Sequence, residues 1–250
     1  MSSHHHSHSH EHEQGGPHRH HESHRHSHGH TSFEDANKQY FNETAHTYND
    51  RPEAHERARR LSAAMRKAYD FDEGTTVVMD YACGTGLISK ELAPYAKSIV
   101  GIDISQKMVD QYNQSVSYQG IEPDEMKAIC AEIKGEPDEL GGSKFDVIVC
   151  ASSYHHFISV EDVTRIIVSH LKFGGSLLVA DLMKEESTVD IFPSETHHLV
   201  AHRGGFSEQE MRTLFENAGL RNFSFETATE AKHFGHPVKL FLAKGDKVDI

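Results

Sequence analysis

The feature that most constrains the fold is the stretch at residues 77–88, where a short apolar run leads into a glycine-rich turn and then into helix-forming sequence. This order predicts a buried strand, a tight loop and the start of a helix. Gly84 and Gly86 lack a Cβ atom, so a ligand can approach the loop backbone beside the amide groups of the helix start. The stretch therefore predicts a ligand-binding loop.

Known phosphate-binding motifs fit this loop poorly. A dinucleotide-binding loop would place a third glycine where Ser89 stands, and a P-loop would contain a Gly-Lys-Ser/Thr run that this stretch lacks. A second clue is Asp103, which ends another predicted strand 23 residues after Asp80. A carboxylate at a strand end can accept hydrogen bonds from both hydroxyls of an adenosine ribose. The pair of motifs indicates a nucleoside ligand.

Five motifs, taken in order, resemble those of the class I S-adenosylmethionine (SAM)-dependent methyltransferases. They are residues 80–86, Asp103, and residues 144–150, 154–157 and 171–175. The resemblance extends from about residue 40 to the C-terminus, and it is closest to the small-molecule enzymes typified by the ubiquinone-biosynthesis type. It implies SAM as the cofactor and methyl transfer to an O, N, S or C atom of a small molecule, with no metal required.

The order of the predicted elements indicates an α/β fold. We expect strands at residues 76–81, 98–103, 126–131, 145–150, 176–180, 222–227 and 238–243, and helices at 52–69 and 86–93 and after Ser105, Ser159 and Ser207. Continuous apolar runs such as residues 177–180 are typical of parallel strands covered on both faces. The resemblance implies a doubly wound, mostly parallel seven-stranded sheet with an antiparallel edge strand, the Rossmann-like methyltransferase fold.

The resemblance also implies a set of cofactor-binding residues. They are Tyr48, Asp80, Ala82, Gly84, Gly86, Asp103, Ile104, Glu132, Ile133 and Ser152. Asp103 would bind the ribose, Glu132 the adenine amino group, and the next backbone amide a ring nitrogen. Tyr48, with Tyr40 as a second candidate, would direct a hydroxyl towards the methionine part of SAM; the alternative is that both rings pack a helix.

Three histidines are candidates for a catalytic base. Methyl transfer needs in-line alignment and, for a protonated nucleophile, a group that accepts the proton. His155 and His156 follow the fourth predicted strand, and His202 lies in the irregular segment at residues 182–206, which we expect to cover the substrate pocket. Alternatively, one of His155 and His156 holds the loop by a hydrogen bond while the other lines the pocket.

The first thirty residues differ sharply from the rest of the chain. They contain 13 of the 23 histidines and no Ala, Val, Leu, Ile, Phe, Tyr or Trp. Such a segment buries too little apolar surface to offset its ordering entropy, so we predict a disordered His-rich tail at residues 1–30 and a methyltransferase domain at 31–250. Clustered imidazoles would bind divalent metals such as Zn²⁺ in vitro. The alternatives are that the tail is an expression tag, or that it stores metal while the domain binds SAM without catalysis.

Charge and composition exclude several classes of partner. The chain carries a net charge of −13, of which the tail contributes −1, and the domain has no Lys/Arg cluster. Nucleic acid and anionic membranes are therefore not expected as partners. An odd number of cysteines, no signal peptide and no membrane-spanning stretch predict a reduced, cytoplasmic protein. A protein methyltransferase would need an open acidic groove for a basic peptide, and an NAD-dependent oxidoreductase is disfavoured by Ser89.

Overall fold

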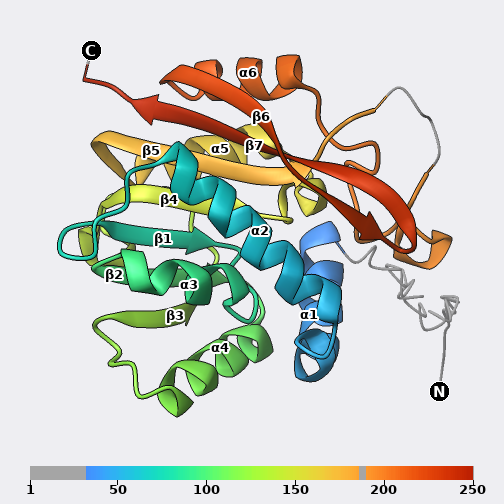
Figure 1. The fold of residues 1–250 in the computed structure, drawn as a ribbon, viewed down its shortest axis with the longest axis horizontal. Coiled ribbons are helices and arrows are strands. Elements are labelled where there is room, and N and C mark those ends of the chain that lie inside the picture. Colours follow the sequence, from blue (N-terminus) through green and yellow to red (C-terminus); the bar gives the residue numbers. More distant parts are fainter. Residues whose placement is uncertain (1–31, 186–189, 250) are drawn as a thin grey trace, which may run out of the picture. The chain divides into compact units, whose positions relative to one another are not determined.

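A seven-stranded sheet in the order β3-β2-β1-β4-β5-β7-β6 forms the framework of the protein (Figure 1). The computed structural model describes residues 32–185 and 190–249, and the predicted metal-binding tail at residues 1–30 lies outside this range. The strands are β1 (Val77–Tyr81), β2 (Ser98–Asp103), β3 (Met126–Cys130), β4 (Phe145–Ala151), β5 (Leu171–Leu182), β6 (Leu220–His233) and β7 (His236–Lys247).

The pairing of the strands confirms the predicted fold class. Strands β1 to β5 pair in parallel, whereas β7 runs antiparallel to both of its neighbours, β5 and β6. The antiparallel β6–β7 pair forms one edge of the sheet. All the parallel strands point their carboxyl ends the same way, so the loops that follow them gather at one rim of the sheet.

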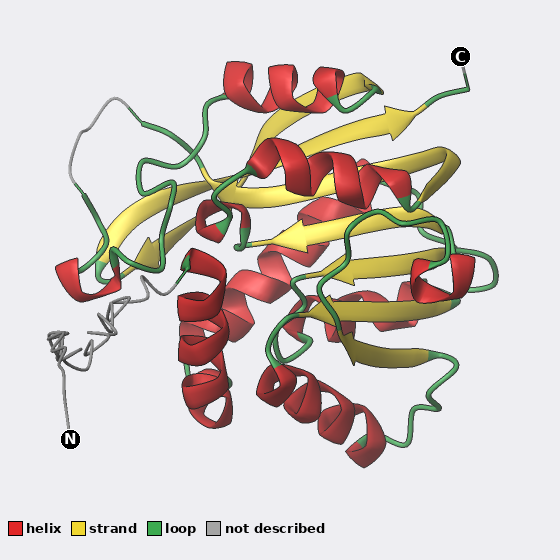
Figure 2. Cartoon of the chain, turned by 180° about the vertical axis from the view of Figure 1, so that it is seen from behind, coloured by secondary structure: helices red, strands yellow, loops and turns green. Residues whose placement is uncertain are grey.

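Helices cover both faces of the sheet (Figure 2). They are α1 (Phe33–Tyr48), α2 (Pro52–Ala68), α3 (Leu87–Leu92), α4 (Gln106–Tyr118), α5 (Val160–Ser169) and α6 (Glu208–Asn217). The predicted serine caps are confirmed: Ser105, Ser159 and Ser207 each accept a hydrogen bond from a backbone amide in the first turn of α4, α5 and α6. None of the described helices is both long and apolar enough to span a membrane.

Two apolar cores lie on opposite faces of the sheet, because successive side chains of a strand alternate in direction. Val78 of β1 packs in the core under α2, α3 and α4, which also contains Met65 and Tyr112. Met79, the next residue, packs in the core under α5 and α6 with Phe215. Both β1 residues are fully buried. This central position makes β1 and its glycine-rich loop the rigid base of the ligand rim.

The largest difference from the sequence prediction is the length of β6 and β7. The two strands continue far beyond the predicted residues 222–227 and 238–243, until His233 pairs with His236. Phe234 and Gly235 connect them with φ angles of 45° and 83°, as a two-residue hairpin turn requires. The outer half of β6 contains many polar residues and lacks the phenylalanines of the predicted part at residues 222–227. The result is a hairpin that reaches the ligand rim.

The start of β5 also differs from the prediction. The helix α5 ends at Ser169 with His170 as its cap, so Leu171 is not part of the helix. Leu171 instead begins β5 and pairs with Phe145, and a shift in register separates this pair from the continuous pairing that begins at Ser176. The predicted strand at residues 176–180 is thus the regular part of a longer one.

Helix α1 is fastened to the rim by three asparagines. The Asn37 side chain donates to the Leu199 carbonyl at 3.1 Å. Asn42 accepts from the Ser105 hydroxyl at 2.9 Å, and Asn49, the C-cap of α1, accepts from the Thr85 hydroxyl at 2.6 Å. The segment that contains Tyr40 and Tyr48 is therefore a helix held against three separate loops.

Candidate functional site

A cavity of about 470 Å³ opens at the carboxyl ends of the parallel strands. Its walls come from α1, from α2, from the loops after β1, β2, β3, β4 and β5, and from the hairpin end of β6 and β7. Ligands of open α/β sheets bind at this rim, so the position agrees with the sequence prediction. A volume of this size is typical of small-molecule sites.

The glycine-rich loop after β1 has an open side and a packed side. Gly84 has a φ of 53°, and a Cβ atom built there would meet nothing within 4 Å. Gly86 has a φ of 84°, but a Cβ atom there would lie 2.5 Å from the Tyr112 ring. Gly84 thus leaves a surface free for a ligand, whereas Gly86 is required by the packing of α4 against the loop. Gly86, although predicted to bind the cofactor, does not line the cavity.

Asp103 links the glycine-rich loop to the end of β2. One carboxylate oxygen accepts from the Gly84 amide at 2.8 Å, and the other accepts from the Ser105 amide at 2.8 Å. Burial raises the pKa of Asp103, while these amides act in the opposite direction and favour the ionised form. Each oxygen keeps a second lone pair. Asp103 can therefore hold the loop and still accept hydrogen bonds from two ligand hydroxyls.

The other predicted cofactor residues gather around this carboxylate. Those that line the cavity are Tyr48, Asp80, Ala82, Ile104, Glu132, Ile133 and Ser152, and Tyr40 lines it as well. Ala82 and Ser152 have φ angles of 55° and 56°, which turn the backbone sharply after β1 and β4. Asp80 is buried and accepts from the Ser89 hydroxyl at 2.6 Å. Burial raises the pKa of Asp80 to about 7. The Ser89 hydrogen bond acts in the opposite direction, and the nearby Asp103 charge raises the pKa further.

His155 forms a buried pair with Asp181 beside the cavity. Its Nδ1 atom lies 2.8 Å from the Asp181 carboxylate, and the two residues are 5% and 0% exposed. The Leu182 amide donates to the same carboxylate at 2.6 Å. Burial alone would raise the pKa of Asp181, but His155 and this amide together lower it. An ionised Asp181 only accepts, so Nδ1 of His155 carries a proton and Nε2 is available to a ligand.

His156 is held differently. Its Nδ1 atom lies 2.7 Å from the Leu199 carbonyl, which can only accept, so Nδ1 is the donor and Nε2 carries the lone pair of the neutral ring. Burial, and then the neighbouring His155 ring at 4.1 Å, lower the pKa of His156 to about 3. His156 is therefore neutral near pH 7 and a weak base.

The structure does not bring His202, the third predicted base, into the cavity. Its amide donates to the His155 carbonyl at 3.0 Å, and its ring packs on Phe206 at 5.0 Å. Nε2 of His202 is buried and has no hydrogen-bond partner among residues 32–185 and 190–249. His202 thus holds the backbone of His155 through its own amide, while its ring packs on Phe206 outside the cavity lining.

Several cavity residues were absent from the sequence prediction. Asp181 directly follows the predicted strand at residues 176–180, but nothing in the sequence paired it with His155, 26 residues away. His233 lines the cavity from the end of β6, and burial, followed by His155 and Arg57, lowers its pKa to about 4. Only the length of the hairpin brings His233 here. Within the described ranges, no cluster of three or more His, Cys, Asp or Glu side chains could hold a metal ion.

Comparison with known proteins identifies a methyltransferase domain. Residues 78–175 match the family model described as a methyltransferase domain. An uncharacterized methyltransferase of Schizosaccharomyces pombe is 43% identical over 151 residues, which are 58% of this chain and 53% of that protein. The ubiquinone biosynthesis O-methyltransferase of Marinobacter nauticus is 24% identical over 153 residues, 57% of this chain and 62% of that protein. The chain spans only about half to three fifths of the length of these relatives.

Solved structures extend the likeness to the whole fold. The structure of magnesium protoporphyrin IX methyltransferase from Synechocystis PCC 6803, which contains bound SAM, matches 85% of this chain and 97% of that chain. The TM-score is 0.60 at 16% sequence identity, so the likeness concerns the fold. The matched methyltransferase domain, the methyltransferase relatives and this shared fold agree with the resemblance to the class I SAM-dependent methyltransferases that the five motifs indicated.

Proposed function

We propose that the protein is an enzyme that transfers a methyl group from SAM to a small molecule. One observation carries the proposal: a single cavity contains the open side of Gly84 and the Asp103 carboxylate together with the His155–Asp181 pair. The first two features suit a nucleoside cofactor, and the pair suits proton removal from an acceptor. A site that only stored SAM would have no use for the second part.

The residues near Asp103 would hold the cofactor. Asp103 accepts the ribose hydroxyls, and the open side of Gly84 lets the ligand lie against the loop backbone. Glu132 and the Ile133 amide bind the adenine ring, and Tyr48 meets the methionine part. When bound, SAM supplies a methyl group that its positively charged sulfur makes electrophilic. These residues define the cofactor half of the cavity.

His155 is the better of the two candidate bases that line the cavity. Its Nδ1–H is fixed by Asp181, which leaves Nε2 to take a proton from a hydroxyl, thiol or ammonium acceptor. Asp181 then stabilises the positively charged ring. His156, with its pKa near 3, instead orients the acceptor or the neighbouring ring. The enzyme's contribution is alignment of the acceptor with the methyl group, exclusion of water and removal of this proton.

The size of the cavity and the elements around it support a small acceptor. About 470 Å³ must hold both the cofactor and the acceptor, and α1, residues 192–200 and the β6–β7 hairpin surround the space beyond the cofactor half. A peptide substrate would need an open groove. The ubiquinone-type O-methyltransferases among the relatives also bear names of small-molecule enzymes.

Calorimetric titration of the full-length protein with SAM, S-adenosylhomocysteine and NADH tests the cofactor. We expect micromolar binding of the first two and none of NADH. Incubation with isotopically labelled SAM and a metabolite extract depleted of macromolecules then tests the transfer, and we expect the label to move into a small molecule. Failure to bind either SAM compound would refute the proposal and favour metal binding by the tail as the function.

A further inference from the structure

The part of the cavity beyond the cofactor half contains positive charge. This acceptor half is lined by α1, α2, residues 192–200 and the β6–β7 hairpin. Arg51 and Arg57 line it from the start of α2, and Lys232 lines it from the end of β6. None of the three forms an ion pair with a carboxylate in the part of the chain that the structure describes, whereas the nearby Arg60 pairs with Glu56 at 2.6 Å. Three cations in this half are thus without a carboxylate partner, and Arg51 lies over the Tyr48 ring at 5.5 Å.

The acids that line the cavity do not neutralise these cations. Asp80, Asp103 and Glu132 lie in the cofactor half, at the ends of β1, β2 and β3. Asp181 is bonded to His155, and Asp162, in the first turn of α5, pairs with Arg165. Glu34 is the acid that remains in the acceptor half among the described residues. A wall formed by Arg51, Arg57 and Lys232 is unexpected in a domain whose net charge is −12. In such a domain, acidic side chains outnumber the basic ones and can pair with most of them.

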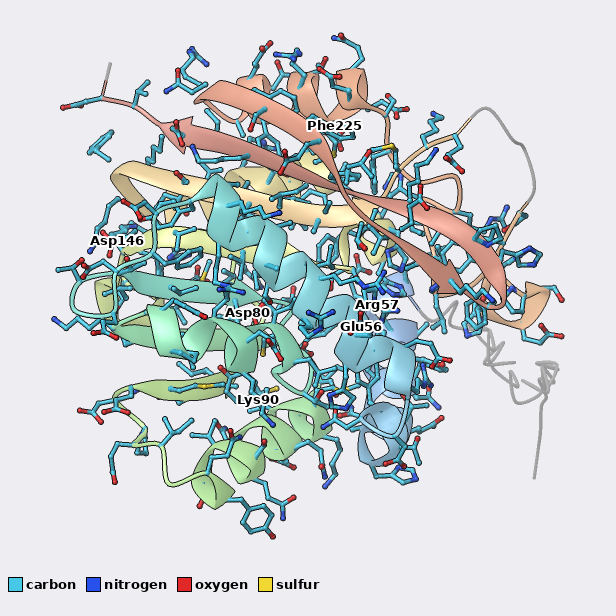
Figure 3. All side chains as sticks on the ribbon, in the orientation of Figure 1. Glu56, Arg57, Asp80, Lys90, Asp146 and Phe225 are labelled. Carbon is cyan, nitrogen blue, oxygen red and sulfur yellow. The ribbon has the colours of Figure 1, made fainter. Side chains whose placement is uncertain are left out.

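Arg57 lines the cavity near the end of the β6–β7 hairpin. Figure 3 shows Arg57 on α2 below the hairpin strands, and Arg60, one turn along α2, donates to the Glu230 carbonyl of β6 at 3.1 Å. The charge of Arg57 helps to lower the pKa of His233, as does His155. His156 and His233 are consequently neutral near pH 7. The positive charge of this wall therefore comes from arginine and lysine.

Apolar side chains also line the acceptor half. The Phe192 ring lies 5.6 Å from the His155 ring and 5.0 Å from the His233 ring. Leu199, Val200 and Leu240 line the same half and are buried. The acceptor half thus combines an apolar surface with a guanidinium, and the His155 base lies beside the Phe192 ring.

We infer that the acceptor is a small organic anion, whose carboxylate binds Arg57 while its apolar or aromatic body packs on Phe192. This inference rests on the proposed function. A guanidinium presents two parallel N–H donors, which match the two oxygens of a carboxylate, and Arg51 and Lys232 add charge at the same wall. The nucleophile of the acceptor then lies near Nε2 of His155. A phosphate group shares this chemistry and is distinguished by the experiment.

Ligand-detected NMR titrations of the full-length protein, saturated with S-adenosylhomocysteine, test the inference. The probes are hydroxylated aromatic carboxylates, each matched with its primary amide and with the corresponding aryl phosphate. We expect the carboxylates to bind at least about tenfold more tightly than the amides. In Arg57→Gln this ratio falls to about threefold or less, while the affinity for S-adenosylhomocysteine is unchanged. Arg59→Gln, which removes an exposed residue paired with Glu56, retains the full ratio.

The outcomes separate the inference from the proposed function. Equal binding of carboxylates and amides, an unchanged ratio in Arg57→Gln, or no binding of any probe to a protein that binds S-adenosylhomocysteine would overturn the anion site and leave the proposed function intact. Tighter binding of the phosphates, lost in Arg57→Gln, would support the site and identify phosphate as its group. A wild-type protein that fails to bind S-adenosylhomocysteine would overturn both.

Discussion

Replacing Asp103 by asparagine tests whether this carboxylate binds the ligand in addition to holding the glycine-rich loop. The carboxylate accepts from the Gly84 and Ser105 amides at 2.8 Å each, and we expect it to accept two ribose hydroxyls as well. Asparagine has one accepting oxygen, and its amide faces one of the two backbone donors. Charge-assisted hydrogen bonds contribute about 1.5–3 kcal/mol each. Losing one and weakening the other reduces binding by about 2–4 kcal/mol, or about 30-fold to 1,000-fold in Kd.

The assay is calorimetric titration of the variant with S-adenosylhomocysteine, together with its thermal unfolding. Some loss of stability is expected, about 1–3 kcal/mol, because one loop amide is left facing a donor. Asp110→Asn is the matched control, because Asp110 is exposed on α4 and lies 3.7 Å from Lys107. The affinity of this variant for S-adenosylhomocysteine should equal that of the wild type. A folded Asp103→Asn protein that binds within about threefold of the wild type would show that this carboxylate does not hold the ribose.

The other predictions concern the glycine-rich loop and the buried ionisable groups. Gly84→Ala should cost only about 1–2 kcal/mol of stability, for its left-handed backbone, but should weaken S-adenosylhomocysteine binding in calorimetry; Gly86→Ala should cost about 2–5 kcal/mol in denaturant unfolding, because its Cβ meets Tyr112. Asp80 has a folded pKa of about 7 against an unfolded value of 3.8, so the native state alone keeps this proton from pH 4 to 7 and loses stability as the pH rises. Asp80→Asn should therefore gain stability relative to the wild type, by on the order of 2–4 kcal/mol at pH 8, and a difference that does not change with pH would contradict this. The pKa of His156 is lowered to about 3, so below pH 6.5 the unfolded chain binds a proton that the native chain does not bind. This difference destabilises the wild type as the pH falls below 6.5. His156→Gln should therefore lose less free energy of unfolding than the wild type when the pH is lowered to 5, as measured by urea unfolding.

The features that could be predicted from the sequence are those set by neighbouring residues. The loop at Gly84 and the serine caps of α4, α5 and α6 follow from local backbone chemistry, and Asp103 is recognisable because an acid ends an apolar strand at a suitable distance. The sheet follows from the alternation of strands and helices. All these signals lie within a few residues of the feature they predict.

The features that escaped prediction depend on distant contacts. The bond between His155 and Asp181 joins residues whose strands are neighbours only in the folded sheet. The outer half of β6 is polar, so its pairing up to His236 left little trace in the sequence, and with it the positions of Lys232 and His233 were missed. Arg57 was one of many charged residues on an amphipathic helix until α2 was placed against the hairpin.

The three asparagine bonds of α1 also constrain the order of folding. This helix leaves the ribosome before the rest of the domain, yet its partners at Ser105 and Leu199 follow Asn42 and Asn37 by 63 and 162 residues. Contacts between residues so far apart in sequence form late, since closing long loops costs entropy before it gains any bond. The cavity is therefore completed at the end of folding, and the amide hydrogens of α1 should exchange with solvent through small openings that leave the sheet intact. A ligand that bridges the glycine-rich loop and α1 would slow that exchange first.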